Sequence, residues 1–206
     1  MATDTGVRLA STGDIDGMAE ALSLAFHDDP IMQWLFGDTH PRPMQYSRPF
    51  FKHEGARHLR NAHVFTLDGT PGAAYWDPPG HWKTNVKDIL TMTPLMVRGM
   101  RSRTLKALRG LSRMEAAHGK HPDHYYLAVL GTRPDRQGAG LGSALMAPVL
   151  DRCDAEGTGA YLESSKEANI PFYRRHGFEV VGEIQFPSGP KLWPMWRDPQ
   201  VPGSRQ

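Results

Sequence analysis

The chain has 206 residues and lacks several features that would indicate a function class by themselves. Its single cysteine, Cys153, excludes a disulfide within the chain and a cysteine-rich zinc site. The formal net charge is only +2, so there is no cationic excess of the kind that nucleic-acid-binding proteins carry. No run approaches the roughly 20 apolar residues of a membrane span, and the first residues show no secretory pattern. We therefore expect a reduced, cytoplasmic protein without a nucleic-acid or membrane partner.

The length suits one domain with a substantial core. The 21 glycines and 17 prolines are spread along the chain and indicate many loops rather than a low-complexity segment. We predict one domain over residues 1–198, with a helical insert at 78–120 and a flexible tail at 199–206.

Hydrophobic periodicity predicts alternating strands and helices. Strands are expected at 7–10, 63–67, 72–77, 125–132, 160–163, 178–184 and 191–197. Helices are expected at 12–26, 31–36, 42–60, within 85–118, at 138–154 and at 169–176. The strand–helix–strand order favours parallel pairing, whereas the early and terminal hairpins favour antiparallel pairing. The sum is a mixed α/β sheet covered by helices.

A glycine-rich loop follows the strand predicted at 125–132 and leads into a helix. Gly138, Gly140 and Gly142 would let backbone N–H groups approach an anion at the helix N-terminus, where the helix dipole favours a diphosphate. A tight strand-to-helix turn without a ligand would show the same pattern. The loop lacks the Lys-Ser or Lys-Thr of a P-loop and the G-x-G-x-x-G spacing of a dinucleotide site.

The run Gln137-Gly138-Ala139-Gly140-Leu141-Gly142 resembles the acetyl-coenzyme A loop of the GCN5-related N-acetyltransferase (GNAT) family, Gln/Arg-x-x-Gly-x-Gly/Ala. The later run from Asn169 through Tyr173 to Gly177-Phe178 resembles the next helix of that family. Within the family, the chain resembles puromycin N-acetyltransferase and related actinobacterial small-molecule acetyltransferases. The resemblance implies the GNAT fold, a mixed and mostly antiparallel twisted sheet of about six or seven strands flanked by helices. It covers mainly residues 125–197, and residues 78–120 would then lie on the acceptor side.

The resemblance also implies a cofactor, acetyl-CoA, and the residues that would bind it. Leu130, Gly131 and Thr132 would lie on the strand along the pantetheine arm, and Asn169 would contact that arm. The pyrophosphate would be held by Gln137, Gly138, Ala139, Gly140, Leu141, Gly142 and Ser143. Gln137 stands where an arginine is often found, so Arg136 or Arg133 is expected to supply the missing charge.

Acetyl transfer to an amine needs a neutral amine, a stabilised thioester oxygen and a proton for the leaving thiolate. Tyr173, which would stand near the cofactor sulfur, is the predicted acid, with a packed aromatic as the alternative role. Glu163, at a strand end, is the candidate base through water, and a structural carboxylate is the alternative. His124 is a second candidate base, and water alone is a third possibility. No metal is expected, because the spacing of His118, His121 and His124 does not place ligands on one helical face.

These observations predict an acetyl-CoA-dependent N-acetyltransferase that acts on a primary amine of a small molecule, such as an aminonucleoside or antibiotic. Direct attack in a ternary complex is expected, because Cys153 should face the sheet and make a poor nucleophile. The alternatives are a non-catalytic acyl-CoA-binding regulatory module and a protein acetyltransferase acting on lysine or an N-terminus. The protein could be a monomer or a homodimer.

Overall fold

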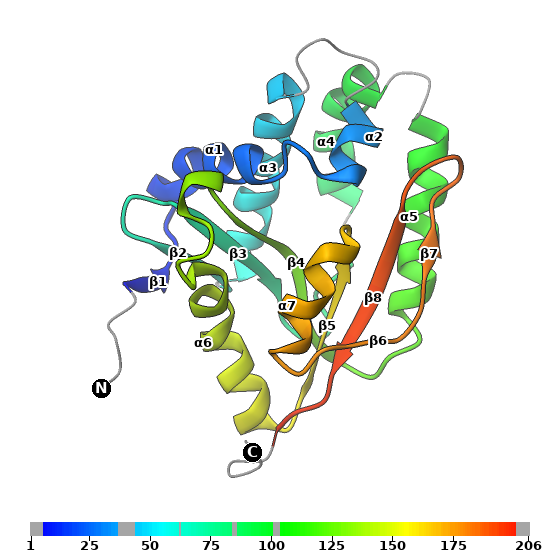
Figure 1. The fold of residues 1–206 in the computed structure, drawn as a ribbon. Coiled ribbons are helices and arrows are strands. Elements are labelled where there is room, and N and C mark those ends of the chain that lie inside the picture. The colour runs from blue at the N-terminus through cyan, green and yellow to red at the C-terminus, as the bar shows by residue number, and fades with distance from the viewer. Residues whose placement is uncertain (1–5, 37–43, 62, 84–85, 101–103, 201–206) are drawn as a thin grey trace.

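The computed structural model describes residues 6–36, 44–61, 63–83, 86–100 and 104–200 (Figure 1). The helices are α1 (Ile15–Ala25), α2 (Pro30–Phe36), α3 (Met44–His58), α4 (Val86–Met100), α5 (Thr104–His118), α6 (Leu141–Glu156) and α7 (Ile170–Arg174). The strands are β1 (Val7–Leu9), β2 (Val64–Leu67), β3 (Gly72–Asp77), β4 (His124–Thr132), β5 (Gly159–Ser164), β6 (Glu179–Val180), β7 (Ile184–Gln185) and β8 (Lys191–Arg197). Each element follows a segment predicted from the sequence, with ends that differ by a few residues.

The strands form one mixed sheet in the order β1-β2-β3-β4-β5-β8-β6, and β7 also pairs with β8. Only the β4–β5 pair is parallel in the described part of the chain, and α6 is its crossover helix. This confirms the mixed, mostly antiparallel α/β fold. The sheet has eight strands, one more than the upper end of the expected count of about six or seven, because the strand expected at 178–184 is divided into β6 and β7.

The break between β6 and β7 has a local cause. β6 pairs with β8 as far as Val180↔Met195, and the next residue of β8 is Pro194. Pro194 accepts a hydrogen bond from the Val181 N–H at 2.9 Å but has no N–H to donate in return. The ladder therefore stops at Val181 and resumes at Ile184↔Leu192.

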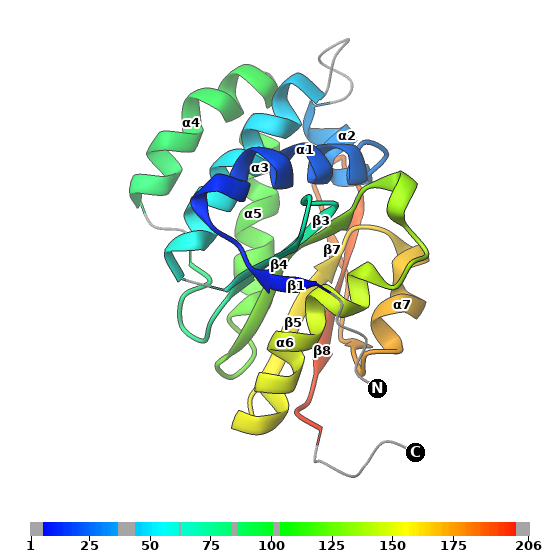
Figure 2. The same cartoon turned by 90° about the vertical axis from the view of Figure 1, so that its left-hand side faces the viewer.

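Each face of the sheet is covered by its own helices (Figure 2). The side chains of α6 that point inward, among them Leu145, Val149 and Cys153, pack on one face together with Leu162 and Met195. The other face is covered by α1, α2, α3 and α5, whose apolar side chains form a second core. Because successive residues of a strand point to opposite faces, Tyr161 and Glu163 lie on the α5 side of β5, and Ala160 and Leu162 lie on the α6 side.

Two further observations concern the chain as a whole. Among the described residues, no helix is both long enough and apolar enough to cross a lipid bilayer. Of the tail predicted at 199–206, residues 201–206 lie outside the described residues, and the Gln200 N–H donates to Asp154 Oδ1 at 2.7 Å.

The strands β4 and β5 diverge toward their carboxyl ends, and this divergence positions the site. Their parallel register ends at Leu127↔Leu162, whereas β4 continues to pair with β3 as far as Gly72↔Thr132. The edge of β4 that faces β5 is therefore without a strand partner beyond Leu127. An opening between two strands exposes backbone N–H and C=O groups that a ligand can bind.

Candidate active site

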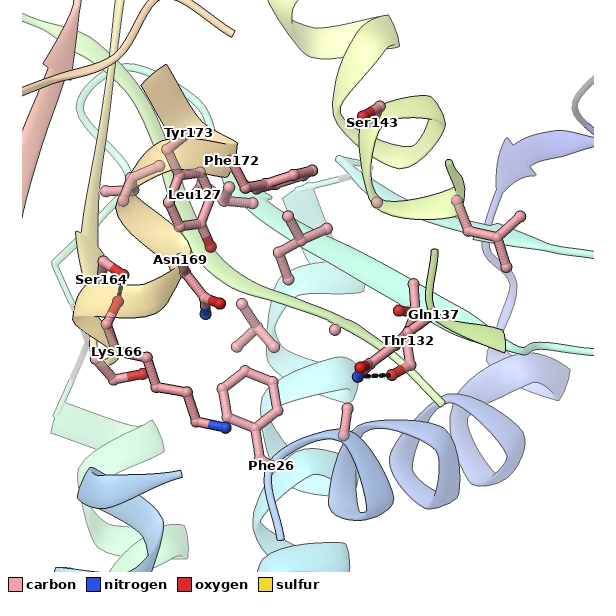
Figure 3. A pocket seen from close by; sticks show the side chains of 18 of the residues that line it. Phe26, Leu127, Thr132, Gln137, Ser143, Ser164, Lys166, Asn169, Phe172 and Tyr173 are labelled. Atoms are coloured by element: carbon pink, nitrogen blue, oxygen red, sulfur yellow. Dashed lines mark hydrogen bonds between the residues drawn. The ribbon is translucent and has the colours of Figure 1, made fainter. Parts of the chain in front are cut away.

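A cavity of about 500 Å³ opens where β4 and β5 diverge (Figure 3). Its lining comes from α1, β4, the loop before α6, the end of β5 and α7. Most of the residues that the sequence predicted for the site line this cavity, whereas Ala139, Arg133 and His124 do not, and Ala139 is exposed on the loop. The predicted residues that line the cavity are Leu130, Gly131, Thr132, Gln137, Gly138, Gly140, Leu141, Gly142, Ser143, Glu163, Asn169 and Tyr173.

The glycines at the start of α6 have two different structural roles. Gly138 and Gly140 have φ of 79° and 78°, in the left-handed region that favours glycine, and Gly140 is the N-cap of α6. Gly142 allows close packing instead, because a Cβ there would lie 3.2 Å from the ring of Phe172. The first-turn N–H groups of this 16-residue helix have no acceptor within the helix, so they are available to an anion in the cavity.

Charged side chains add to this anion site. Arg136 and Arg175 both line the cavity. Arg133, the other arginine considered for the missing charge, pairs with Asp135 at 3.0 Å and is not part of the lining. The side chain of Gln137 donates to the Thr132 carbonyl at 3.3 Å, which ties the glycine loop to the end of β4.

Tyr173 lies on α7, and its hydroxyl points into the cavity (Figure 3). Its ring packs against Phe172 and Phe178, with ring centroids 5.2 and 6.2 Å away. Burial raises the pKa of Tyr173, and the nearby Asp29 carboxylate raises it further. The phenol therefore keeps its proton at neutral pH and can act as a donor inside the cavity.

The turn between α1 and α2 closes one side of the cavity. Asp29 accepts hydrogen bonds from the Ile31 and Met32 N–H groups at 2.9 and 3.1 Å, which caps α2. The other oxygen of Asp29 accepts a hydrogen bond from the Ser165 hydroxyl at the end of β5. Next to it, Lys166 pairs with Asp28 at 2.6 Å. These bonds hold the α1–α2 turn against the strand that carries Glu163.

Glu163 lies on the opposite face of β5 from the α6 core, and its side chain is only 3% exposed. Burial raises the pKa of its carboxyl to about 7, and the Tyr126 hydroxyl, a hydrogen-bond donor to it, partly opposes that shift. The Tyr161 hydroxyl is near enough to act in the same direction, without a hydrogen bond of regular geometry. Among the described residues, Glu163 Oε1 has no hydrogen-bond partner. A carboxyl with a pKa near 7 is suited to accept and release a proton at neutral pH.

The histidines of this region do not line the cavity. His124 is buried at the start of β4, where it contacts the Pro122 carbonyl and His118 of α5, so it does not have the cavity position that a base would need. No group of three His, Cys, Asp or Glu side chains within the described ranges is arranged to hold a metal ion. Cys153 faces the α6 core as predicted, is fully buried, and has a pKa raised by burial to about 12.

Sequence reasoning missed several lining residues that neighbour no motif. Ala25 and Phe26 reach the cavity only because α1 crosses the end of β4, which depends on tertiary packing. Phe172 and Arg175 could have been found, because they flank Tyr173 on one short helix.

Residues 109–198 match a family model described as an acetyltransferase (GNAT) domain. This segment contains the glycine loop, Asn169 and Tyr173, and it is similar to the GNAT acetyltransferase domain. It is 25% identical over 174 residues to an uncharacterized N-acetyltransferase of Schizosaccharomyces pombe, across 80% of this chain and 70% of the relative. The family match and the relative named an N-acetyltransferase support transferase activity, and the GNAT family uses acetyl-CoA as its acyl donor.

Solved structures share the fold along nearly the whole chain. A Corynebacterium glutamicum protein described as histone acetyltransferase HPA2 and related acetyltransferase superposes with a TM-score of 0.67, at 24% identity, covering 96% of this chain and 97% of that one. The Drosophila melanogaster polyamine N-acetyltransferase, an enzyme that forms N-acetylagmatine, gives a TM-score of 0.62, at 17% identity, covering 93% and 98%. These similarities establish the GNAT fold.

Proposed function

We propose that this chain is an acetyl-CoA-dependent N-acetyltransferase that acetylates the primary amine of a small molecule by direct attack in a ternary complex. The observation that carries the proposal is the cavity between β4 and β5. A helix N-terminus, an unpaired strand edge and a protonated phenol face this one space, and Glu163, with its buried carboxyl, borders it. In this proposal residues 1–198 act as one catalytic unit, with the helices of segment 78–120 on the acceptor side.

The residues present fit the cofactor. Backbone N–H groups from Gly138 to Ser143 would hold the pyrophosphate at the N-terminus of α6, with Arg136 and Arg175 supplying positive charge. The free edge of β4 from Leu130 to Thr132 would bond the amide groups of the pantetheine arm, together with Asn169. Acetyl-CoA would supply the acetyl group in activated form, as a thioester.

Tyr173 would act as the acid. Its raised pKa keeps the phenol protonated before the reaction, so its O–H can donate to the sulfur as negative charge develops there. Its position on α7, fixed by the contacts with Phe172 and Phe178, gives the hydroxyl a defined direction into the cavity.

Glu163 would act as the base. Above its pKa of about 7 the carboxylate can accept the proton that the amine loses, directly or through one water. Tyr173 and Glu163 lie on different elements that border the same cavity, which suits an acid and a base acting on the two sides of one acyl group.

Direct attack is supported by the buried position of the cysteine. Cys153, the single cysteine, is fully buried in the α6 core and is not part of the cavity lining. Because burial holds its pKa at about 12, the thiol would not ionise at neutral pH. An acetylated cysteine is therefore not part of the proposed route.

The proposed acceptor class is a small amine. Structural neighbours include enzymes named for agmatine and for arylalkylamines, and they share the fold at 15% to 17% identity. The resemblance to puromycin N-acetyltransferase makes an aminonucleoside a second member of the same class. A protein substrate is the alternative, because one neighbour is named a histone acetyltransferase.

A thiol-release assay against a panel of acceptors tests this function. The panel contains agmatine, an arylalkylamine, an aminonucleoside and a lysine-containing peptide, each with acetyl-CoA. We expect amine-dependent release of free thiol with at least one small amine and background release with the peptide. Release with the peptide alone would overturn the small-amine proposal. Tight acetyl-CoA binding without release for any acceptor would support a regulatory module instead.

A further inference from the structure

His118 and His124 form a buried pair between α5 and the sheet, behind Glu163 as seen from the cavity. The two residues are 3% and 2% exposed, and their Nε2 atoms lie 2.7 Å apart. Trp82 stacks on the His118 ring with centroids 4.0 Å apart. Two neutral imidazoles at this distance share one proton, so one Nε2 donates and the other accepts.

The hydrogen-bond partners determine which nitrogen of each ring carries the proton. His124 Nδ1 lies 2.6 Å from the Pro122 carbonyl, which can only accept, so His124 carries its proton on Nδ1. Its Nε2 is then bare and accepts from His118 Nε2–H. His118 is left with a bare Nδ1, and that atom lies 3.9 Å from Glu163 Oε1.

Both rings are neutral at pH 7. Burial lowers the pKa of His118 to about 3, and His124 and His121 lower it further, while Asp77 acts in the opposite direction. Burial and His121 also lower the pKa of His124, against the Pro122 carbonyl and Asp123.

We propose that His118 is a positioning residue for Glu163: its tautomer, fixed by His124 and the Pro122 carbonyl, leaves a bare nitrogen 3.9 Å from the carboxyl, and a small approach of the two groups lets that nitrogen accept the carboxyl proton in a hydrogen bond. The catalytic consequence of this inference rests on the proposed function of Glu163 as base. When Glu163 takes a proton, its new O–H donates to His118 Nδ1, and the proton stays on the carboxyl because His118 resists protonation. The pair thus stabilises the protonated form of Glu163 and makes it a stronger base.

Other charged or titratable groups face Glu163 from the elements packed on it. Tyr126 of β4 donates to the carboxyl, and Tyr161 lies two residues before Glu163 on β5. Asp77 of β3 is the residue paired with Tyr126 in the β3–β4 register. Arg57 of α3 is 3.6 Å from Asp77 and balances that charge. The two tyrosines favour ionised Glu163, so His118 is the side chain among these that favours the protonated form by hydrogen bonding.

The substitution His124→Phe tests the fixed tautomer. It keeps an aromatic ring in the stack and removes the acceptor for His118 Nε2–H. His118 can then carry its proton on Nδ1 and donate to the Glu163 carboxylate, which lowers the carboxyl's pKa. We expect the acidic limb of kcat/KM, and the Glu163 carboxyl band in infrared pH-difference spectra, to move to lower pH by about one unit or more. His121→Phe is the matched control, because His121 stacks on Trp196 and has no hydrogen bond to His118, so both readouts should stay unchanged.

Glu163→Gln assigns the infrared band, and ¹⁵N NMR of the unsubstituted protein reads the tautomers without any variant. Protonated His118 Nε2 and His124 Nδ1 at pH 7 support the inference, and the reverse tautomers or an imidazolium would overturn it. An unmoved carboxyl band in His124→Phe, with acetylation still observed, overturns the inference and leaves the proposed function standing. A shifted band in a protein that acetylates no amine supports the inference and removes the proposed function.

Discussion

Removing the hydroxyl of Tyr173 is the sharpest test of how this site handles protons. Tyr173→Phe deletes one oxygen and keeps the ring contacts with Phe172 and Phe178. Among the described residues no hydrogen bond to the hydroxyl is found that would break, so the free energy of unfolding should change by less than about 1 kcal/mol.

A positioned general acid contributes about 10² to 10⁴ in rate, which is about 3 to 5 kcal/mol of transition-state stabilisation. We therefore expect the single-turnover rate of Tyr173→Phe, with both substrates saturating, to fall by that factor. The dissociation constant for acetyl-CoA should stay within about twofold, because the proposed phosphate site on α6 is untouched.

Tyr125→Phe is the matched control, since it removes a tyrosine hydroxyl that donates to Glu156 at 2.8 Å, away from the cavity. It should lower stability by about 1 kcal/mol and leave the single-turnover rate unchanged. A Tyr173→Phe rate equal to that of the unsubstituted protein would refute the acid role.

Three other predictions follow from charge, backbone geometry and burial. Glu163→Gln should remove the acidic limb of kcat/KM near pH 7. Because the pKa of Glu163 is raised from 4.5 to about 7 in the folded protein, the protonated carboxyl favours folding at low pH, and this contribution is lost as the pH rises through 7. Urea unfolding at pH 8 should therefore show the variant to be more stable than the unsubstituted protein by up to about 3 kcal/mol. Equal stability at pH 8 would contradict the buried carboxyl. Gly140, at the N-terminus of α6, and Gly157, at its C-terminus, have φ of 78° and 65°, so substitution of either by alanine should destabilise the fold by about 1–2 kcal/mol. Calorimetry should show acetyl-CoA binding weakened at least about tenfold in Gly140→Ala and unchanged in Gly157→Ala, because only the N-terminus of α6 faces the proposed phosphate site. Cys153→Ala should keep full activity, and the native thiol should not react with a disulfide reagent at pH 7; loss of turnover in a folded variant would reopen a covalent route.

The sequence predicted the part of the site that a contiguous motif encodes. The loop from Gln137 to Ser143 and the pair Asn169 and Tyr173 line one cavity, because a strand, a glycine turn and a helix fix their backbone locally. Their roles in binding and catalysis stay predictions. The prediction that Ala139 lines the site is wrong, because the left-handed glycines on both sides of it turn its side chain outward.

Tertiary packing determines the features that the sequence did not reveal. The contribution of Phe26 and Asp29, in the turn after α1, requires knowledge of how that helix crosses β4. The His118–His124 contact joins the end of α5 to the start of β4, and no spacing rule for metal ligands or catalytic triads describes it. The break between β6 and β7 depends on Pro194, which lies on another strand. In each case the decisive neighbour is distant in sequence.

A crystal structure with coenzyme A bound would test the central claim most directly, namely that the cavity between β4 and β5 is the acetyl-CoA site. The account predicts the pyrophosphate at the N-terminus of α6, the pantetheine arm along the free edge of β4, and the sulfur within hydrogen-bond reach of the Tyr173 hydroxyl. Phosphates bound away from α6, or a sulfur directed away from both Tyr173 and Glu163, would contradict it.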